Sequence, residues 1–229
     1  MPSPVLVLAA HPDDETLGCG GTIRKLSDQG HPIMLITFTD GEGARISTNY
    51  IDTNHTNPPE DRNQLLPQVC QVLGISQWVS GTFPDNRMDS VDLLDLVKFI
   101  EDTLTQYQFK PQIIFTHHPD CLNIDHSLVY RATVTAFRPQ KGRSIRIYSY
   151  FVPSSTDYNP LANFRGNVYF RLNDSQVAAK QEALRIYNQE MRRYPHTRSY
   201  RNLNHLNNVW GSEIGTKNAE KFQLIRQVF

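Results

Sequence analysis

Residues 5–15 read VLVLAAHPDDE, and this stretch decides how the rest of the chain is interpreted. Residues 5–8 are continuously apolar, which predicts a buried strand that ends near Ala10. One imidazole and three carboxylates follow within five residues. Burying such groups costs free energy unless they bind something. The hypothesis is therefore that the loop after the first strand forms half of a metal site.

Alternation of strand and helix patterns through residue 137 predicts the fold class. Apolar runs predict strands at residues 5–10, 32–38, 78–80 and 112–116. Helical spacing of apolar side chains predicts helices at residues 14–29, 60–73, 93–104 and 128–137. This order indicates an α/β protein with a Rossmann-like, doubly wound, mostly parallel sheet and helices on both faces.

The C-terminal part has a different pattern. We expect strands at residues 145–150 and 168–172, a helix at 174–191 and a last helix at about 219–228. No repeat or linker divides the chain, so residues 1–229 are expected to form one domain, with residues 140–229 completing the substrate pocket. The polar loop at residues 44–58 is long for a connection without a function, and it is predicted to be a flap over the pocket.

The overall composition is that of an ordinary globular protein. Hydrophobic residues make up 39% and charged residues 20%, and 23 basic residues balance 23 acidic ones. This balance argues against a general electrostatic attraction to nucleic acid. We see no signal peptide and no apolar run of the roughly 20 residues that span a bilayer. The sequence thus predicts a cytoplasmic protein without membrane insertion, in which three widely spaced cysteines stay reduced.

A second dense cluster, HHPDCLNIDH at residues 117–126, follows the predicted fourth strand. The carboxyl ends of parallel strands lie at the same edge of a sheet, and ligands of doubly wound folds bind there. The first and fourth strands both end in His/Asp clusters. The two clusters are therefore expected to form one shared site.

These residue types fit a hydrolytic zinc site. Such sites commonly use three His or Asp/Glu ligands and keep one position open for water, whose proton a nearby carboxylate removes. His11, Asp14 and His126 could be the ligands and Asp13 the base, although spacing alone does not decide between Asp13 and Asp14. Fe2+ or another divalent ion also suits the donors. If His11 and Asp14 merely capped the next helix, the second cluster would be unexplained.

The run AHPDDE at residues 10–15 resembles the signature of the PIG-L/LmbE family of zinc-dependent N-deacetylases, which hydrolyse N-acetyl groups of glucosamine-type sugars. Similarity extends over nearly the whole chain. Further matching stretches are TDGE at 39–42, Arg62, PDN at 84–86, NIDH at 123–126, YPHTRS at 194–199 and AEKF at 219–222.

The resemblance assigns roles to individual residues. It implies that His11, Asp14 and His126 are the zinc ligands and that Asp13 is the general base. Asp125 is expected to orient a neighbouring imidazole or the substrate. Residues expected to contact the substrate are Arg62, Asp85 and His117.

The chain departs from the family pattern at two positions. Asn123 stands where many members have a histidine credited with stabilising the oxyanion or protonating the amine. An amide can donate a hydrogen bond to an oxyanion but cannot transfer a proton at neutral pH. The proton must then come from Asp13 or from another imidazole, for which His196, His117 and His118 are candidates, His196 first. Leu65 replaces a frequent glutamate after Arg62, which weakens the substrate role of Arg62.

The resulting expectation is a hydrolase that removes an N-acetyl group from an N-acetylated amino sugar or sugar conjugate. Its partner would be a small molecule, and a homo-oligomer is compatible with the sequence. One alternative is a metal-dependent amidase or esterase with a non-sugar substrate. A second is a non-catalytic metal- or nucleotide-binding module, which the complete set of ligands and base disfavours.

Overall fold

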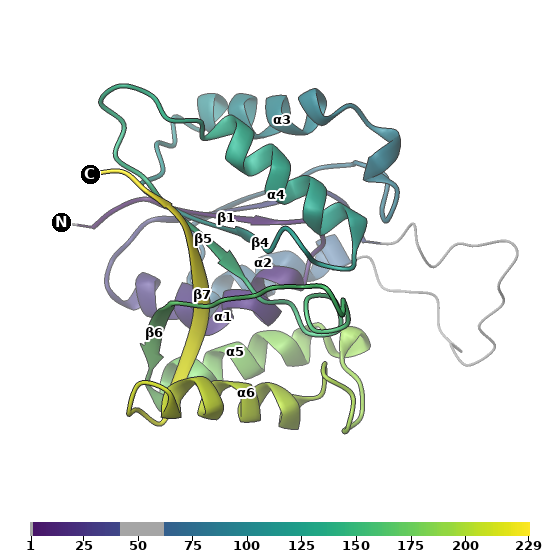
Figure 1. Ribbon diagram of the computed structural model, residues 1–229, viewed down its shortest axis with the longest axis vertical. Helices are drawn as coiled ribbons and strands as arrows, with labels where there is room; N and C mark the ends of the chain where they lie inside the picture. Colours follow the sequence, from purple (N-terminus) through teal and green to yellow (C-terminus); the bar gives the residue numbers. More distant parts are fainter. Residues whose placement is uncertain (1, 42–61) are drawn as a thin grey trace, which may run out of the picture.

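The computed structural model describes residues 2–41 and 62–229. The flap predicted at residues 44–58, and Glu42 of the TDGE stretch, lie outside the described residues. In the described ranges, seven strands form one sheet in the order β3-β2-β1-β4-β5-β7-β6 (Figure 1). The strands are β1 (Val5–Ala9), β2 (Ile33–Thr37), β3 (Gln77–Ser80), β4 (Ile113–His117), β5 (Arg146–Tyr150), β6 (Val168–Leu172) and β7 (Asn218–Gln227).

Most of the sheet is parallel, as the sequence predicts. β1 pairs in parallel with β2 and β4, and the parallel pairing continues to β3 on one side and β5 on the other. β7 then runs antiparallel between β5 and β6. The predicted α/β, Rossmann-like doubly wound class is therefore confirmed.

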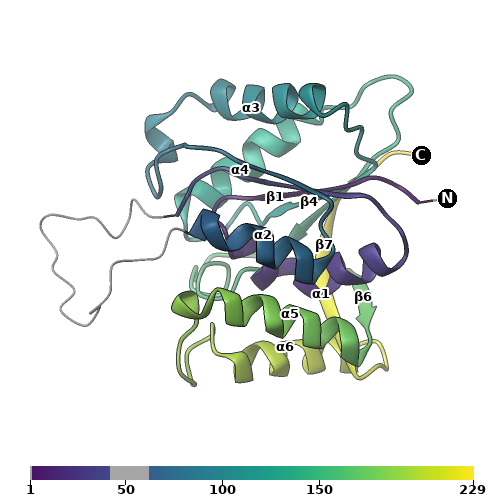
Figure 2. The ribbon, with the colours of Figure 1, turned by 180° about the vertical axis from the view of Figure 1, so that it is seen from behind.

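Helices cover both faces of the sheet (Figure 2). They are α1 (Asp14–Asp28), α2 (Arg62–Leu73), α3 (Leu93–Gln106), α4 (Ile124–Ala136), α5 (Asp174–Ile186) and α6 (Tyr200–Ser212), with the short 3-10 helices η2 (Met88–Ser90) and η3 (Asn188–Glu190). α1, α2, α5 and α6 contribute to one apolar core, and α3 and α4 contribute to the other. Val5 and Val7 face the first core while Leu6 and Leu8 face the second, which explains the continuous apolar run. No helix in these ranges is both long and apolar enough to cross a bilayer.

The C-terminal prediction needs two corrections. The helix expected at residues 219–228 is wrong, because residues 218–227 form β7 and pair with two strands. Helix α5 ends at Ile186 rather than near Met191, and η3 follows it. Helix α6 has no counterpart in the prediction. Pairing between segments distant in sequence thus overrides the helix-forming composition of residues 219–228.

Candidate active site

The two His/Asp clusters meet at the carboxyl edge of the sheet. His11, Asp13 and Asp14 follow β1, while Asp125 and His126 lie in the first turn of α4, which follows β4. β1 and β4 are neighbours, but α1 and α4 cover opposite faces. The cluster therefore lies at the topological switch point, where doubly wound sheets bind their ligands.

The three predicted metal ligands lie together. Asp14 Oδ2 is 3.1 Å from His11 Nδ1 and 3.2 Å from His126 Nε2. One donor atom from each residue lies within 4.8 Å of the others, and all three residues are buried. Two imidazole nitrogens and one carboxylate oxygen form a ligand set that suits zinc or another divalent transition metal.

The hydrogen bonding of this cluster leaves room for a cation. Asp14 Oδ1 is buried and has no hydrogen-bond partner among the described residues. His126 Nε2 is also buried without one, because its 3.2 Å contact with Asp14 Oδ2 lacks hydrogen-bond geometry. Burial is the largest effect on the pKa of His126, and it lowers that pKa. Burial would raise the pKa of Asp14, but His126, His117 and the hydrogen bond to His11 hold it well below its usual value. A neutral imidazole and an ionised carboxylate are the forms that bind metal ions.

A second layer of carboxylates orients His11. Its Nε2 lies 3.0 Å from Asp85 Oδ1 and 3.1 Å from Asp125 Oδ2. Asp125 is itself fixed, because it accepts from the backbone N–H groups of Asn86 at 2.6 Å and Met88 at 3.1 Å. Although burial lowers the pKa of His11, hydrogen bonds to Asp125, Asp14 and Asp85 raise it well above its usual value. These partners leave Nδ1 beside Asp14, where a metal ion would replace its proton.

Asp13 has a strained backbone and a buried side chain. Its φ of 128° lies in the region that favours glycine. A non-glycine residue in this region has a strained backbone, and such strain is found mainly at functional sites. Its carboxylate accepts from Arg198 Nη1 at 3.1 Å and lies 3.7 Å from Arg62 Nη1. Burial raises the pKa of Asp13 to about 8, against the opposing effect of the two arginines. A carboxylate with this pKa can accept and return a proton near neutral pH.

Arg198 and Glu190 are the site residues that sequence reasoning missed. Arg198 Nε donates to Ser154 Oγ at 2.7 Å, which fixes the guanidinium next to Asp13. Glu190 is buried and lies 3.8 Å from both Arg198 and Arg62. Arg198 belongs to the YPHTRS stretch at residues 194–199, which matches the family pattern, but that match does not indicate that its guanidinium contacts Asp13.

The remaining predicted residues surround the cluster at different depths. Asn123 caps α4 by accepting from Asp125 N at 2.9 Å, and its Nδ2 donates to Asn86 Oδ1 at 2.8 Å. His117 is completely buried, accepts from Ala10 N at 2.9 Å and stacks on His126 with ring centres 3.9 Å apart. His196 is partly exposed, and its Nδ1 accepts from Arg198 N at 3.0 Å.

These contacts separate a central group from peripheral residues. Arg62, Asp85 and Asp125 contact His11 or Asp13. His196 is linked to Asp13 through Arg198. His118 contacts Gln223 Oε1 at 3.2 Å.

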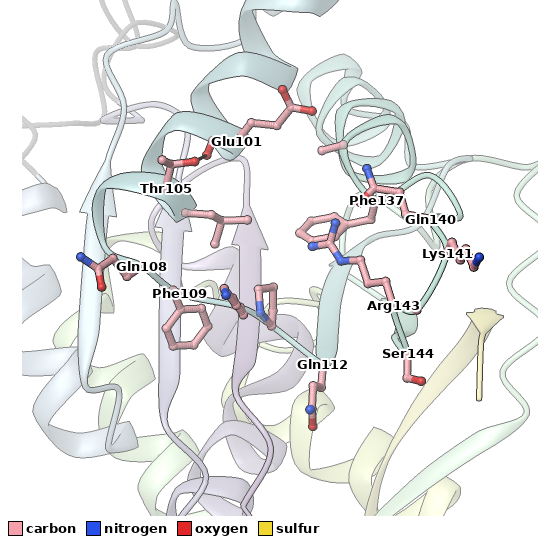
Figure 3. A pocket seen from close by; sticks show the side chains of 15 residues that line it. Glu101, Thr105, Gln108, Phe109, Gln112, Phe137, Gln140, Lys141, Arg143 and Ser144 are labelled. Carbon is pink, nitrogen blue, oxygen red and sulfur yellow. Dashed lines mark hydrogen bonds between the residues drawn. The ribbon is translucent and has the colours of Figure 1, made fainter.

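A cavity of about 770 Å3 lies elsewhere on the molecule. Its lining comes from the segments that precede β4 and β5, including Phe109, Gln112 and Arg143 (Figure 3). The Arg143 guanidinium lies 4.8 Å from the centre of the Phe137 ring. This cavity is at the amino edge of the sheet, opposite the His/Asp cluster, so it is not part of the candidate active site.

The fold and the cluster define a class of protein: a doubly wound α/β protein with a His/Asp/His centre of the metal-binding type at its switch point. A family model described as PIG-L, GlcNAc-PI de-N-acetylase, matches residues 6–137, which is more than half of the chain. The chain therefore belongs to the PIG-L family, a family of deacetylases.

A curated relative is similar in sequence, and two solved structures share the fold. A probable N-acetyl-alpha-D-glucosaminyl L-malate deacetylase 2 of Bacillus cereus is 33% identical over 135 residues, which cover 58% of this chain and 60% of the relative. The match thus spans less than two thirds of that curated relative. The N,N'-diacetylchitobiose deacetylase of Pyrococcus horikoshii has the same fold, with a TM-score of 0.74, 19% identity and coverage of 97% of this chain and 84% of the other. A conserved protein of Thermus thermophilus also has it, with a TM-score of 0.74, 20% identity and coverage of 99% and 96%.

Proposed function

We propose that this protein is a metal-dependent N-deacetylase that removes an N-acetyl group from an amino sugar or sugar conjugate. The observation that carries the proposal is the His11, Asp14 and His126 cluster with the Asp13 carboxylate beside it. Family membership supports the reaction type. The deacetylase activities named for the Bacillus and Pyrococcus relatives support an N-acetylated sugar as the substrate class.

His11, Asp14 and His126 are the proposed ligands of a divalent transition metal, with zinc as the first choice. Such an ion, when bound, lowers the pKa of a coordinated water and polarises the acyl carbonyl. The buried Asp14 Oδ1 and His126 Nε2, which have no hydrogen-bond partner among the described residues, support this assignment. Asp85 and Asp125 hold the His11 ring so that Nδ1 stays on the side of Asp14.

Asp13 is the proposed general base. It accepts a proton from the attacking water and, with a pKa of about 8, can return it to the leaving amine. Arg198 and Arg62 orient its carboxylate. This route needs no additional imidazole, so it accounts for Asn123 at a position where relatives often have histidine. His196 is the second candidate for protonating the amine.

Asn123 is the proposed donor to the developing oxyanion. Its amide group has two N–H bonds, and one of them is directed to Asn86 Oδ1. None of the described residues accepts from the second N–H, so it can donate to the acyl oxygen. Arg62 and Asp85 are proposed to line the substrate pocket. His117 is completely buried, so it would act on the substrate through the stacked His126 ring.

A substrate panel tests this function. Zinc-loaded protein is incubated with N-acetylated sugars, sugar conjugates and non-sugar N-acetyl amides, and the free amine is measured. We expect amine release from at least one sugar compound, and none from a matched His126→Ala control. Release from the non-sugar amides alone would show that the protein is an amidase of another substrate class.

A further inference from the structure

We propose that Lys180 and Glu220 are positioning residues that set the direction of the metal-binding first turn of α1. This inference rests on the proposed metal site. Both residues belong to the C-terminal part of the chain, Lys180 to α5 and Glu220 to β7. They nevertheless contact the backbone of α1, six or more residues beyond the proposed ligand His11.

Helix α1 is interrupted at Cys19. That residue has φ −147° and ψ 19°, which are not helical values, although the helix continues on both sides. In a regular α-helix the Leu17 carbonyl would accept from the Gly21 N–H. The turn before the interruption contains Asp14, and the remainder of the helix runs to Asp28. The direction of the first turn therefore depends on what holds the backbone at this break.

Lys180 and Glu220 supply side-chain partners on both sides of the break. Lys180 Nζ donates to Leu17 O at 3.0 Å and to Glu220 Oε1 at 2.6 Å. The Glu220 carboxylate accepts from Gly21 N at 3.1 Å and from Thr22 N at 2.7 Å. The ion pair thus bridges the two backbone groups that a regular helix would join to each other.

The setting of this pair makes its geometry rigid. Lys180 is 3% exposed and Glu220 is completely buried, so water cannot substitute for either partner. Gly20 and Gly21 allow the close approach, because a Cβ at Gly21 would lie 2.5 Å from Leu172 Cδ1 and one at Gly20 would lie 3.3 Å from Lys180 Cγ. Without the pair, Leu17 O and Gly21 N can bond to each other. The first turn would then rotate and carry Asp14 away from His11 and His126.

A double variant tests the proposal. Lys180→Met with Glu220→Gln removes both charges together, so no unpaired charge stays buried. The EDTA-treated variant and the wild type are titrated with Co2+, and both binding affinity and the visible d–d spectrum are recorded. We expect Co2+ affinity to fall about tenfold or more, the usual effect of losing an outer support of a metal site, and the spectrum to change. On a cleaved substrate, kcat should fall while KM changes little.

Ile100→Ala is the matched control. Ile100 is completely buried in the core on the face of the sheet opposite to α1. Its truncation should therefore destabilise the fold and leave the surroundings of α1 unchanged. The control should keep wild-type Co2+ affinity and spectrum. A folded double variant that keeps the Co2+ affinity and the d–d spectrum of the wild type would overturn the proposal. Because these measurements need no substrate, failure of the sugar panel would overturn the proposed function alone.

Hydrogen exchange on the wild type covers the case in which the double variant does not fold. If the ion pair and the metal site are coupled, metal binding must also stabilise the break in α1, since coupling is reciprocal. Added Zn2+ should slow exchange of the Gly21 and Thr22 amides more than that of amides in α3. Equal exchange with and without Zn2+ would contradict the proposal.

Discussion

Arg198 donates from Nη1 to Asp13 Oδ2 at 3.1 Å, although 185 residues separate the two in sequence. The contact joins the loop after β1 to the segment between η3 and α6. Asp13 thereby receives its main cationic neighbour from outside the region matched by the family model. The properties of the proposed base therefore depend on the C-terminal part of the chain.

Asp13→Asn and His126→Ala should both abolish deacetylation, for different reasons. The first removes the proposed base, and we expect kcat/KM to fall about a hundredfold or more. The second removes a proposed ligand, so bound zinc should also fall. Zinc per protein and amine release are measured on the same samples. Full activity in Asp13→Asn would contradict its role as base.

Arg198→Met should shift the pH dependence of kcat/KM. Arg198 lowers the pKa of Asp13, whose value of about 8 results from burial against this opposing charge. Removing the guanidinium raises the Asp13 pKa further, so the ascending limb of the profile should move to higher pH. Arg198→Lys keeps a positive charge and should shift the limb less. Unchanged profiles in both variants would show that Arg198 does not tune the base.

Asp125→Asn should weaken metal binding without removing a ligand. Asp125 lies 3.1 Å from His11 Nε2 and accepts from two backbone N–H groups. Losing such an orienting carboxylate typically costs about ten- to a hundredfold in metal affinity. Zinc affinity is measured by competition with a chelator. Asp120→Asn removes an exposed carboxylate from the loop that precedes α4; it is the control and should bind zinc like the wild type.

The three cysteines should resist thiol reagents in the native protein. Cys19, Cys70 and Cys121 are buried free thiols. Burial raises the pKa of Cys121 to about 11, and it raises those of Cys19 and Cys70 as well. The reactive thiolate is therefore scarce at pH 8, and labelling of Cys121 should accelerate as the pH rises toward 11. Mass spectrometry should find three labels after unfolding, and rapid native labelling at pH 8 would contradict this burial.

The sequence predicted the N-terminal architecture well because local patterns determine it. Strands β1, β2 and β4 are buried on both faces, so each appears as an uninterrupted apolar run. The C-terminal part was less predictable. Residues 218–227 contain many helix formers, but they pair with β5 and β6, which are remote in sequence. Helix α6 contains several asparagines, whose low helix propensity hides it from pattern analysis.

The candidate site was predictable to the extent that it follows strand ends. His11, Asp14 and His126 come together because β1 and β4 are adjacent. Nothing local to Arg198 indicates that its guanidinium reaches Asp13, since that contact depends on how the segment after η3 crosses the site. For Asn123 the difficulty is different: the sequence identifies the residue but does not determine its role. The sequence marked it as a departure, and the structure shows it capping α4, a role that any Asn before a helix can have.

The position of β7 in the sheet has a consequence for partial unfolding. Glu220 lies in β7, so its contact with the α1 backbone requires β7 to be in place between β5 and β6. A molecule in which β7 had detached could keep the pairing of β1 with β2 and β4, but the break in α1 would lose this support. On our proposal, metal binding would be tight only while β7 is in place, and it would therefore protect the protein against partial unfolding of the C-terminal strand.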